Sequence, residues 1–193
     1  MSNVFFASDH HFGHNNILTF TNYDGSKARD FTDLNEMHDT MVYNHNSVVG
    51  KSDLIYFLGD VCIELPHLEQ LGRMNGRKIL VKGNHDIFHL PHYLKYFEDI
   101  VSYKVFPDGF ICSHIPLHTE SLSKRFLTNV HGHTHSNTVR IEGTLIDDPR
   151  YINVCMEKIN FTPVEKTELL KRTKKSMEDY ASYIDSRLCW ELM

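Results

Sequence analysis

Three short apolar runs in the first half of the chain each end directly in a cluster of aspartate, asparagine or histidine residues. The runs cover residues 3–8, 53–58 and 78–82. Their length and their content of β-branched and aromatic residues favour strands over helices. We therefore expect strands that carry polar side chains at their carboxyl ends.

Helices are predicted between these strands. Residues 33–46 open on a plausible cap at Thr32 or Asp33, and residues 66–74 stop before the helix-ending pair Asn75-Gly76. Strands that alternate with helices indicate a parallel sheet joined by right-handed crossovers. In such a sheet the ligand site lies beyond the carboxyl ends of the strands. The polar clusters are therefore predicted to lie in the ligand site.

The second half of the chain has a different pattern. Residues 100–106 and 110–113 flank Pro107-Asp108-Gly109, in which proline fixes φ and glycine accepts positive φ, so a hairpin is predicted. Residues 138–142 and 151–155 continue the strand pattern. We expect these segments to form a second, more antiparallel sheet.

The C-terminal segment, residues 163–188, is helical by composition. Its apolar side chains available for packing are Leu169, Leu170, Met177 and Ile184. Its basic residues are interspersed with glutamates, which favours a solvated helix face over a nucleic-acid-binding surface. With no repeat or linker in the sequence, residues 1–193 are predicted to form a single α/β domain.

Composition restricts the classes of function. The formal net charge is −5 and the pI is about 6.2, which argues against long duplex nucleic acid as a partner. The N-terminus lacks the pattern of a signal peptide, and no apolar run approaches the ~20 residues of a membrane span. The four cysteines, Cys62, Cys112, Cys155 and Cys189, form no C-x-x-C pair. Buried reduced thiols and a cytoplasmic location, with no membrane association, are the expectation.

The first two polar clusters offer carboxylates and one imidazole. Asp9 and His11 stand two positions apart at a predicted strand end, where an extended backbone points both side chains the same way. Taken alone, this pair is better explained by a capping or turn aspartate beside a surface histidine. Asp60 follows Gly59 at the next strand end, and its two carboxylate oxygens suit a ligand shared by two cations.

The third cluster, Gly83-Asn84-His85-Asp86, offers three separate chemical groups. Asn84 has an amide oxygen for a metal. His85 can act as an acid or donate to a phosphoryl oxygen, and Asp86 can hold His85 in one tautomer. A tight turn remains the alternative explanation, because Gly and Asn favour turns.

The remaining histidines lie in the last third of the chain. His114 follows the hairpin, where a single histidine is more often a packed core residue than a ligand. His133 and His135 share one face of a predicted extended loop, and Gly132 leaves room for a ligand beside them. His131 is expected to lie at a strand end or behind the ligands.

The seven candidate ligands provide two carboxylates, one amide and four imidazoles. They are Asp9, His11, Asp60, Asn84, His114, His133 and His135. If Asp60 is shared, the set supplies four donors to each of two metals. Oxygen and imidazole donors without thiolate fit two divalent ions in a catalytic site. Manganese is preferred, with iron, zinc or nickel as alternatives.

In this order, the motifs Asp-x-His, Gly-Asp, Gly-Asn-His-Asp, a lone His and Gly-His-x-His resemble those of the calcineurin-like metallophosphoesterases. They span residues 9–135, and the opening Ser8–Ile17 segment is similar to a small bacterial and phage branch of that family. The resemblance implies a two-sheet α/β/β/α sandwich, here followed by a C-terminal helix. It also assigns the ligands. Asp9, His11, Asp60 and His135 would hold one metal, and Asp60, Asn84, His114 and His133 the other.

The activity that the resemblance implies is hydrolysis of a small phosphodiester or phosphomonoester. A hydroxide bridging the two metals would attack phosphorus in line, and His85, held by Asp86, would stabilise the transition state or protonate the leaving alkoxide. Two other functions remain open. One is a nuclease acting on short or single-stranded nucleic acid, and the other is a non-catalytic scaffold.

Overall fold

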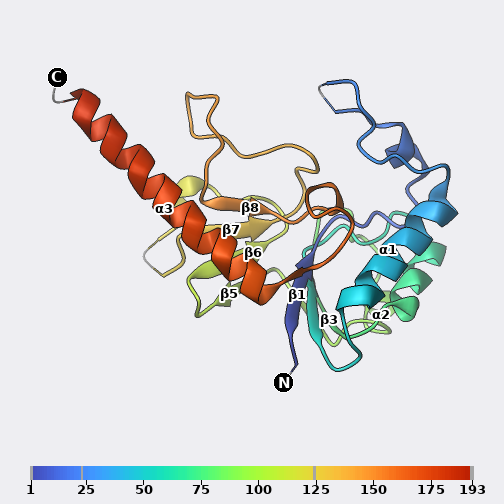
Figure 1. Ribbon diagram of the computed structural model, residues 1–193. Helices are drawn as coiled ribbons and strands as arrows, with labels where there is room; N and C mark the ends of the chain where they lie inside the picture. The colour runs from blue at the N-terminus through green and yellow to red at the C-terminus, as the bar shows by residue number, and fades with distance from the viewer. Residues whose placement is uncertain (1, 23, 124, 192–193) are drawn as a thin grey trace.

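The computed structural model describes residues 2–22, 24–123 and 125–191, with side chains described except at positions 176 and 185–191. The protein has a mixed α/β fold with two sheets and several helices (Figure 1). The first sheet has the strand order β4-β3-β2-β1-β9, formed by Asp99–Val101, Arg77–Val81, Leu54–Phe57, Val4–Ala7 and Val164–Glu165. Strands β1 to β4 are parallel, as the alternating pattern predicts for β1 to β3, and β9 is antiparallel to β1.

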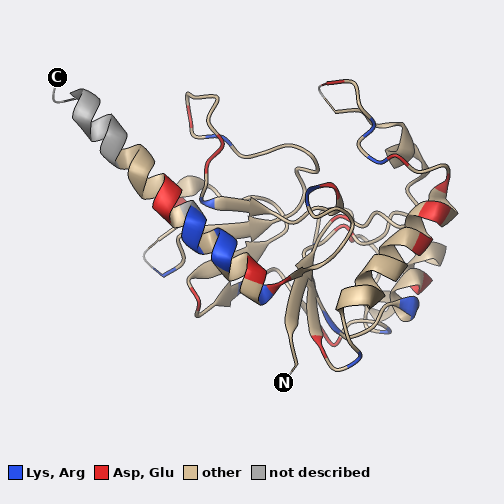
Figure 2. Ribbon diagram, viewed as in Figure 1, with Lys and Arg blue, Asp and Glu red and all other residues tan. Residues whose placement is uncertain are grey.

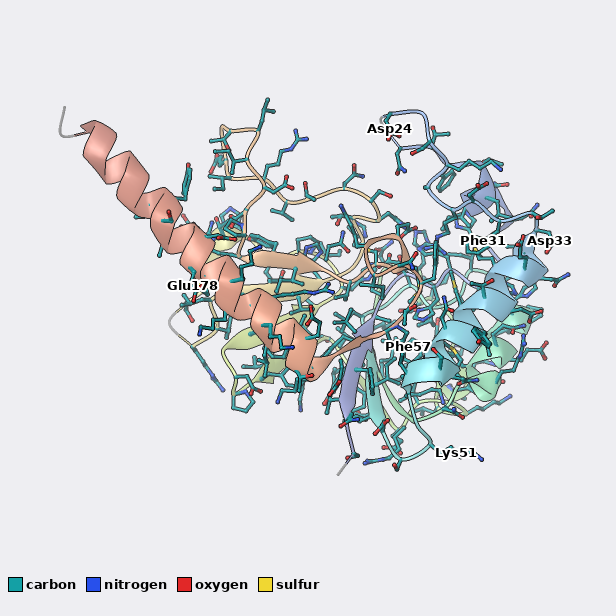
Figure 3. All side chains as sticks on the ribbon, viewed as in Figure 1. Asp24, Phe31, Asp33, Lys51, Phe57 and Glu178 are labelled. Atoms are coloured by element: carbon teal, nitrogen blue, oxygen red, sulfur yellow. The ribbon has the colours of Figure 1, made fainter. Side chains whose placement is uncertain are left out.

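Helical segments connect the parallel strands. Helix α1 spans Leu34–Val48 between β1 and β2, and Asp33 caps it by accepting a 2.9 Å hydrogen bond from the Glu36 backbone N–H. Figure 3 shows Asp33 at this end of the helix. The predicted second helix is a 3-10 helix, η2, at Leu65–Arg73. The short helices are η1 (Asn15–Thr19), α2 (Leu90–Tyr93), η3 (Thr119–Ser121) and η4 (Met156–Lys158).

The second sheet has the order β5-β6-β7-β8, formed by Tyr103–Phe106, Phe110–Ser113, Thr128–His131 and Tyr151–Asn153. The hairpin prediction is confirmed, because β5 and β6 pair antiparallel. The expectation of a second, more antiparallel sheet is met only at this hairpin, since β6–β7 and β7–β8 pair in parallel. Long connections between these strands return the chain to the same end of the sheet.

Two strand predictions in this half need correction. The run 100–106 is not one strand, because Ile100 and Val101 belong to β4 of the first sheet whereas Tyr103 begins β5 of the second. Residues 138–142 form no strand, and only an isolated bridge between Arg140 and Asp147 is found there. A buried strand, β7, lies instead at Thr128–His131.

Aromatic side chains join the two sheets. The Phe6 ring lies 5.4 Å from that of Phe106 and 5.8 Å from that of Phe110, and Tyr56 lies 5.2 Å from Phe106. On the opposite face of the first sheet, Phe57 points toward α1 (Figure 3). Burial of these large rings on both faces fixes the position of the central strand ends.

Helix α3 spans Lys166–Glu191 and packs against β1, β7 and β9 (Figure 1). It begins later than predicted, because the residues after Pro163 form β9. Leu169 is fully buried, whereas Ile184 is exposed rather than packed. Acidic and basic residues are mixed along the helix, as Figure 2 shows. No helix among the described residues is long and apolar enough to cross a membrane.

The cysteine prediction is confirmed in part. Cys62, Cys112 and Cys155 are buried and free. The side chain of Cys189 lies outside the described residues.

Candidate metal centre

The carboxyl ends of both sheets bring the candidate ligands together. Asp9, Asp60 and Asn84 follow β1, β2 and β3 of the first sheet. His114 follows β6, and His133 follows β7, in the second sheet. The aromatic packing between the sheets therefore holds polar side chains from five strand ends in one region.

The first donor group consists of Asp9, His11 and His135, whose ligand atoms lie within 4.8 Å of one another. Asp9 Oδ1 is 3.6 Å from His11 Nε2 and 3.9 Å from His135 Nε2. Ligands on opposite sides of one ion with bonds of about 2.1 Å would be about 4.2 Å apart. The two measured separations are therefore compatible with one bound ion.

The second donor group consists of Asp60, His114 and His133, again within 4.8 Å. Asn84 joins it, because its Oδ1 lies 2.9 Å from His114 Nε2. The rings of His114 and His133 meet edge to face, with centroids 5.1 Å apart. All seven residues predicted as ligands thus lie in these two adjoining groups.

Asp60 belongs to the second group and also faces the first. Its Oδ2 atom is 3.3 Å from His114 Nε2 and 3.7 Å from His11 Nε2. Its Oδ1 atom accepts a 2.8 Å hydrogen bond from the His85 backbone N–H. One carboxylate oxygen is therefore held by the chain, and the other faces donors from both groups.

Five of the ligand candidates have a left-handed backbone. Seven described residues other than glycine have positive φ, and they include Asp9, His11, Asp60, His133 and His135, with φ between 50° and 68°. The extended backbone expected for Asp9–His11 and His133–His135 is therefore wrong, although the side chains do converge. Such conformations cost roughly 1–2 kcal/mol per residue and concentrate at functional sites.

Two glycines allow the chain to pass close to the carboxylates of the centre. A Cβ atom on Gly132 would clash with Ser8 Oγ and Asp9 Oδ2, and one on Gly83 would clash with Asp60. Gly132 therefore makes room as predicted, but for the side chains of Ser8 and Asp9 instead of a bound ligand. No side chain can be added at either position without displacing a carboxylate of the site.

Buried polar atoms at the centre lack partners. Among the described residues, Asp9 Oδ1 and His11 Nε2 are buried and make no hydrogen bond. Burial alone would raise the pKa of Asp9, but the nearby His11 imidazole, whose Nε2 lies 3.6 Å from Asp9 Oδ1, and the charge of His114 hold that pKa below its ordinary value. Asp9 is thus an ionised carboxylate with one oxygen open to a cation.

Two histidines are fixed in the tautomer that a metal ligand needs. His114 Nδ1 lies 2.7 Å from the Leu58 carbonyl oxygen, and His135 Nδ1 lies 3.0 Å from Glu157 Oε1. Because these oxygens can only accept, each Nδ1 carries a proton, and Nε2 is left as the nitrogen that can bind a metal once it has lost any proton of its own.

Arg29 and Glu157 support the centre, and neither is singled out by the sequence. Arg29 is fully buried, and its guanidinium donates to Glu157 Oε1 and to the backbone carbonyls of Asp9 and His10. Burial would raise the pKa of Glu157, but the charge of Arg29 and the bond to His135 lower it to about 2. The residues are 128 positions apart, and no local pattern distinguishes them from surface charges.

The structure contradicts the role predicted for Asp86. Its two carboxylate oxygens accept hydrogen bonds from the backbone N–H groups of Asp60, Val61 and Gly83, at 2.8–3.1 Å. No bond joins the side chains of Asp86 and His85 in the described part of the chain. Asp86 therefore fastens the loop after β2 to the loop after β3 instead of orienting an imidazole.

His85 itself is exposed at the edge of the centre. Its ring centroid lies 5.7 Å from that of His11. Its backbone N–H, not its side chain, makes the bond to Asp60. The imidazole is therefore available to a group that binds there.

His131 belongs to neither donor group. It ends β7, is buried, and its Nδ1 lies 2.8 Å from the Gly132 carbonyl oxygen. Burial lowers the pKa of His131 to about 4, so the ring is neutral at pH 7. The strand-end role expected for this residue is confirmed.

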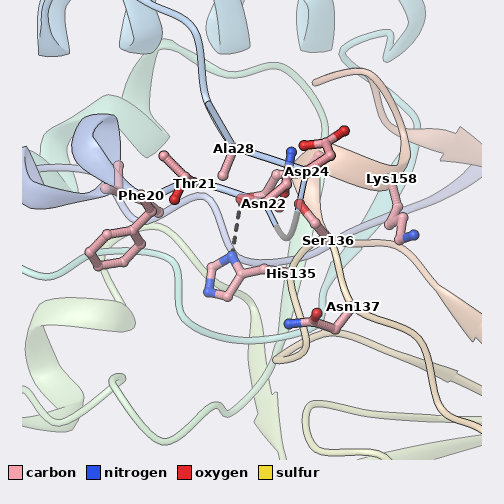
Figure 4. Close-up of a pocket in the computed structure, with 11 residues that line it drawn as sticks. Phe20, Thr21, Asn22, Asp24, Ala28, His135, Ser136, Asn137 and Lys158 are labelled. Atoms are coloured by element: carbon pink, nitrogen blue, oxygen red, sulfur yellow. Dashed lines mark hydrogen bonds and ion pairs between the residues drawn. The ribbon is translucent and has the colours of Figure 1, made fainter. Parts of the chain in front are cut away.

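A cavity of about 900 Å³ opens beside the centre (Figure 4). His135 forms part of its wall, together with residues from the segments 17–28 and 157–158. The dashed line in Figure 4 marks the contact between His135 and Glu157. The candidate metal centre therefore adjoins a space large enough for a small molecule.

Comparisons with known proteins identify relatives but no activity. No family model matches the sequence. The uncharacterized protein MJ1445 of Methanocaldococcus jannaschii is 30% identical over 179 residues, covering 91% of this chain and 93% of the relative. The gene 66 protein of Mycobacterium phage D29 is 27% identical over 189 residues, with 81% and 89% covered. A crystal structure of AQ665 from Aquifex aeolicus, a protein of unknown function, matches with a TM-score of 0.63 at 25% identity, covering 89% of this chain and 99% of that one.

Proposed function

The chain belongs to the same family as MJ1445 of Methanocaldococcus jannaschii, and we propose that it is a phosphoesterase of the calcineurin-like type with two metal ions. One observation carries the proposal. Asp60 Oδ2 lies within 3.7 Å of an imidazole nitrogen from each of two donor groups. A carboxylate placed in this way suits a ligand shared by two cations.

The unpartnered atoms fit such ions. Asp9 Oδ1 and His11 Nε2 are buried without hydrogen bonds among the described residues, and an unsatisfied buried polar group costs roughly 1–3 kcal/mol or more. A divalent ion in the first group would satisfy both atoms. The left-handed backbone at five ligand positions supports the same proposal, since strain of this kind is usually retained for function.

The donor chemistry supports manganese, with iron, zinc or nickel as alternatives, because the donors are oxygen and imidazole. Cys155 does not change this preference. Its thiol lies 3.1 Å from Asp9 Oδ2, on the oxygen that already binds Ser8 and the His133 backbone. Burial raises the pKa of the Cys155 thiol far above its usual value, so it stays protonated.

The protein's own groups have separate roles in the proposed reaction. Bound ions would supply positive charge for the phosphate and lower the pKa of a water molecule. Asp9 and Asp60 anchor the centre, and Arg29 with Glu157 orients His135. The exposed His85 imidazole stands where it can donate a proton or a hydrogen bond to the ester oxygen that leaves.

The fold is consistent with the proposed family. Two sheets pack through aromatic rings, with α1 against the first sheet and α3 against strands of both sheets (Figure 1). This arrangement supports the α/β/β/α sandwich that the sequence resemblance implies. The proposal still depends on the chemistry of the centre, because folds alone do not determine activity.

The direct test is a panel of phosphomonoesters, linear phosphodiesters and cyclic nucleotides assayed with added manganese. We expect metal-dependent hydrolysis of at least one class by the wild type and its loss in Asp60→Asn. Cleavage confined to single-stranded oligonucleotides, with steep salt dependence, would identify the nuclease instead. Tight binding of two ions without any hydrolysis would indicate the scaffold.

A further inference from the structure

We propose that the cavity beside His135 binds the organic part of the substrate, and that this part is a nucleoside. The inference rests on the proposed function, since it places the phosphate at the metal centre. The cavity volume of about 900 Å³ lies in the range of small-molecule sites, about 300–1,000 Å³. A cavity of this size can hold a nucleotide but cannot accommodate the surface of a folded protein.

The cavity is placed to receive a group attached to a bound phosphate. His135 presents Nε2 toward Asp9 and contributes to the cavity wall with the same ring. Ile17 and Ala28 provide apolar wall, and Ser136 and Asn137 follow His135 directly along the chain. A phosphate ester centred between the donor groups would therefore extend its organic part past His135.

Phe20 provides a flat apolar surface for a base. It is 47% exposed although it lines the cavity. Its ring meets that of His14 edge to face, with centroids 5.6 Å apart and an interplanar angle of 85°. The ring is therefore held in place while much of its surface stays accessible, as a stacking platform requires.

Polar groups in the cavity match the edge of a base and a ribose. Asn22 Oδ1 is buried and accepts no hydrogen bond from any described group, although its Nδ2 donates to Ser26 Oγ at 3.0 Å. Asn137 adds a second carboxamide. Carboxamides offer a donor and an acceptor side by side, which suits the hydrogen-bonding edge of a nucleobase.

Lys158 adds a positive charge on the far side of the cavity. Figure 4 shows Phe20 and Lys158 on opposite sides of His135. A ligand that spans them would combine a flat ring at one end with a hydrogen-bond acceptor at the other. A lipid ester fits less well, because amide, hydroxyl and ammonium groups share the wall with Ile17, Phe20 and Ala28.

Matched substrate pairs test this assignment in the manganese-loaded protein. Thymidine 5′-(p-nitrophenyl phosphate) and methyl p-nitrophenyl phosphate share a leaving group and differ in the other arm. Adenosine 5′-monophosphate and glycerol 3-phosphate provide a monoester pair. We expect kcat/KM to be at least about fivefold higher for the nucleoside member of the pair that is hydrolysed, as stacking alone would give.

Two variants test whether the preference for a nucleoside depends on the cavity. Phe20→Ala should lower the ratio of the two kcat/KM values about fivefold or more. Tyr43→Ala removes an aromatic side chain that is 74% exposed on α1 and should leave the ratio unchanged. Equal kcat/KM values within the pairs, or equal effects of the two variants, would overturn the assignment.

A binding measurement separates this inference from the proposed function. Calorimetry on the manganese-loaded protein should show thymidine 5′-monophosphate binding at least about fivefold more tightly than methyl phosphate, with the difference reduced in Phe20→Ala. If no ester is hydrolysed, the proposed function fails and this affinity ratio alone decides the cavity assignment. Equal affinities would then refute the nucleoside site as well.

Discussion

Arg29 and Glu157 form a buried ion pair, with Nε and Oε1 2.7 Å apart, directly behind the candidate ligand His135. Arg29 also donates to the backbone carbonyls of Asp9 and His10. One guanidinium thus binds both the loop after β1 and the carboxylate that orients His135. This link connects the first sheet to the polypeptide after β8.

Removing the charge of Arg29 should destabilise the protein. Arg29→Met leaves Glu157, whose side chain is 4% exposed, as a buried carboxylate without its guanidinium partner and with only His135 beside it, and we expect a loss of about 3–5 kcal/mol in the free energy of unfolding. Arg73→Met is the matched control, because it breaks an exposed pair with Asp39 and should cost about 0–1 kcal/mol. Urea denaturation of both variants checks this. Equal losses of unfolding free energy in the two variants would show that the buried pair contributes no more to stability than the exposed pair does.

Glu157→Gln should weaken metal binding. Glutamine keeps an oxygen that can accept from His135 Nδ1 but no longer carries the charge that makes the imidazole a better ligand. Loss of such a partner typically costs about 10- to 100-fold in metal affinity. Manganese titration by calorimetry measures the effect. Glu98→Gln, in an exposed pair with Arg77, should bind as the wild type does.

His85→Ala should separate chemistry from metal binding. The backbone N–H that binds Asp60 Oδ1 remains in the variant, so both ions should still bind. Turnover should fall by about 10²- to 10⁴-fold, the usual contribution of a general acid. Metal content and kcat are measured on the same preparation. Full turnover would remove His85 from the mechanism, and loss of metal would show that its side chain supports the centre.

His45 should make the fold acid-sensitive. Burial lowers the pKa of His45 to about 4, below an unfolded value of about 6.5. Its Nε2–H donates to the Asn75 carbonyl oxygen, and its buried Nδ1 has no partner among the described residues. The unfolded chain therefore binds the proton more readily between these values. The free energy of unfolding therefore falls as the pH is lowered from 6.5 toward 4. Above pH 6.5 this loss of stability is absent.

In metal-free protein, the His45 contribution should be about 1.4 kcal/mol of unfolding free energy per pH unit within that window. His45→Gln keeps a donor for Asn75 but cannot titrate, so its unfolding free energy should depend less steeply on pH by this amount. His89→Gln changes an exposed histidine and serves as control. Identical slopes for wild type and His45→Gln would contradict the assignment.

The sequence predicts three strands of the first sheet and the candidate ligands because both depend on local signals. Short apolar runs mark β1, β2 and β3, and a polar cluster follows each one. The candidate ligands converge because the parallel strands end at the same edge of the sheet. The left-handed backbone at these residues could not be predicted, because aspartate and histidine carry no local preference strong enough to indicate it.

Other features depend on contacts between distant residues. Strand β7 has a polar start, Thr128-Asn129, that resembles a loop, yet Asn129 is fully buried. Its side-chain amide donates to the Ile111 carbonyl and to Ser113 Oγ. Asp86 likewise matches a catalytic motif in sequence, but the fold directs its carboxylate to three backbone N–H groups. Such partners are known only once the chain is folded.

Manganese titration of the metal-free protein, with phosphate-ester hydrolysis followed at each addition, tests the central claim most directly. The two donor groups predict that activity rises until two ions are bound per chain and then levels off. Asp60→Asn should neither hold two ions nor reach that activity. Saturation of activity at one ion per chain, or two bound ions without hydrolysis of any ester, would contradict a dinuclear phosphoesterase.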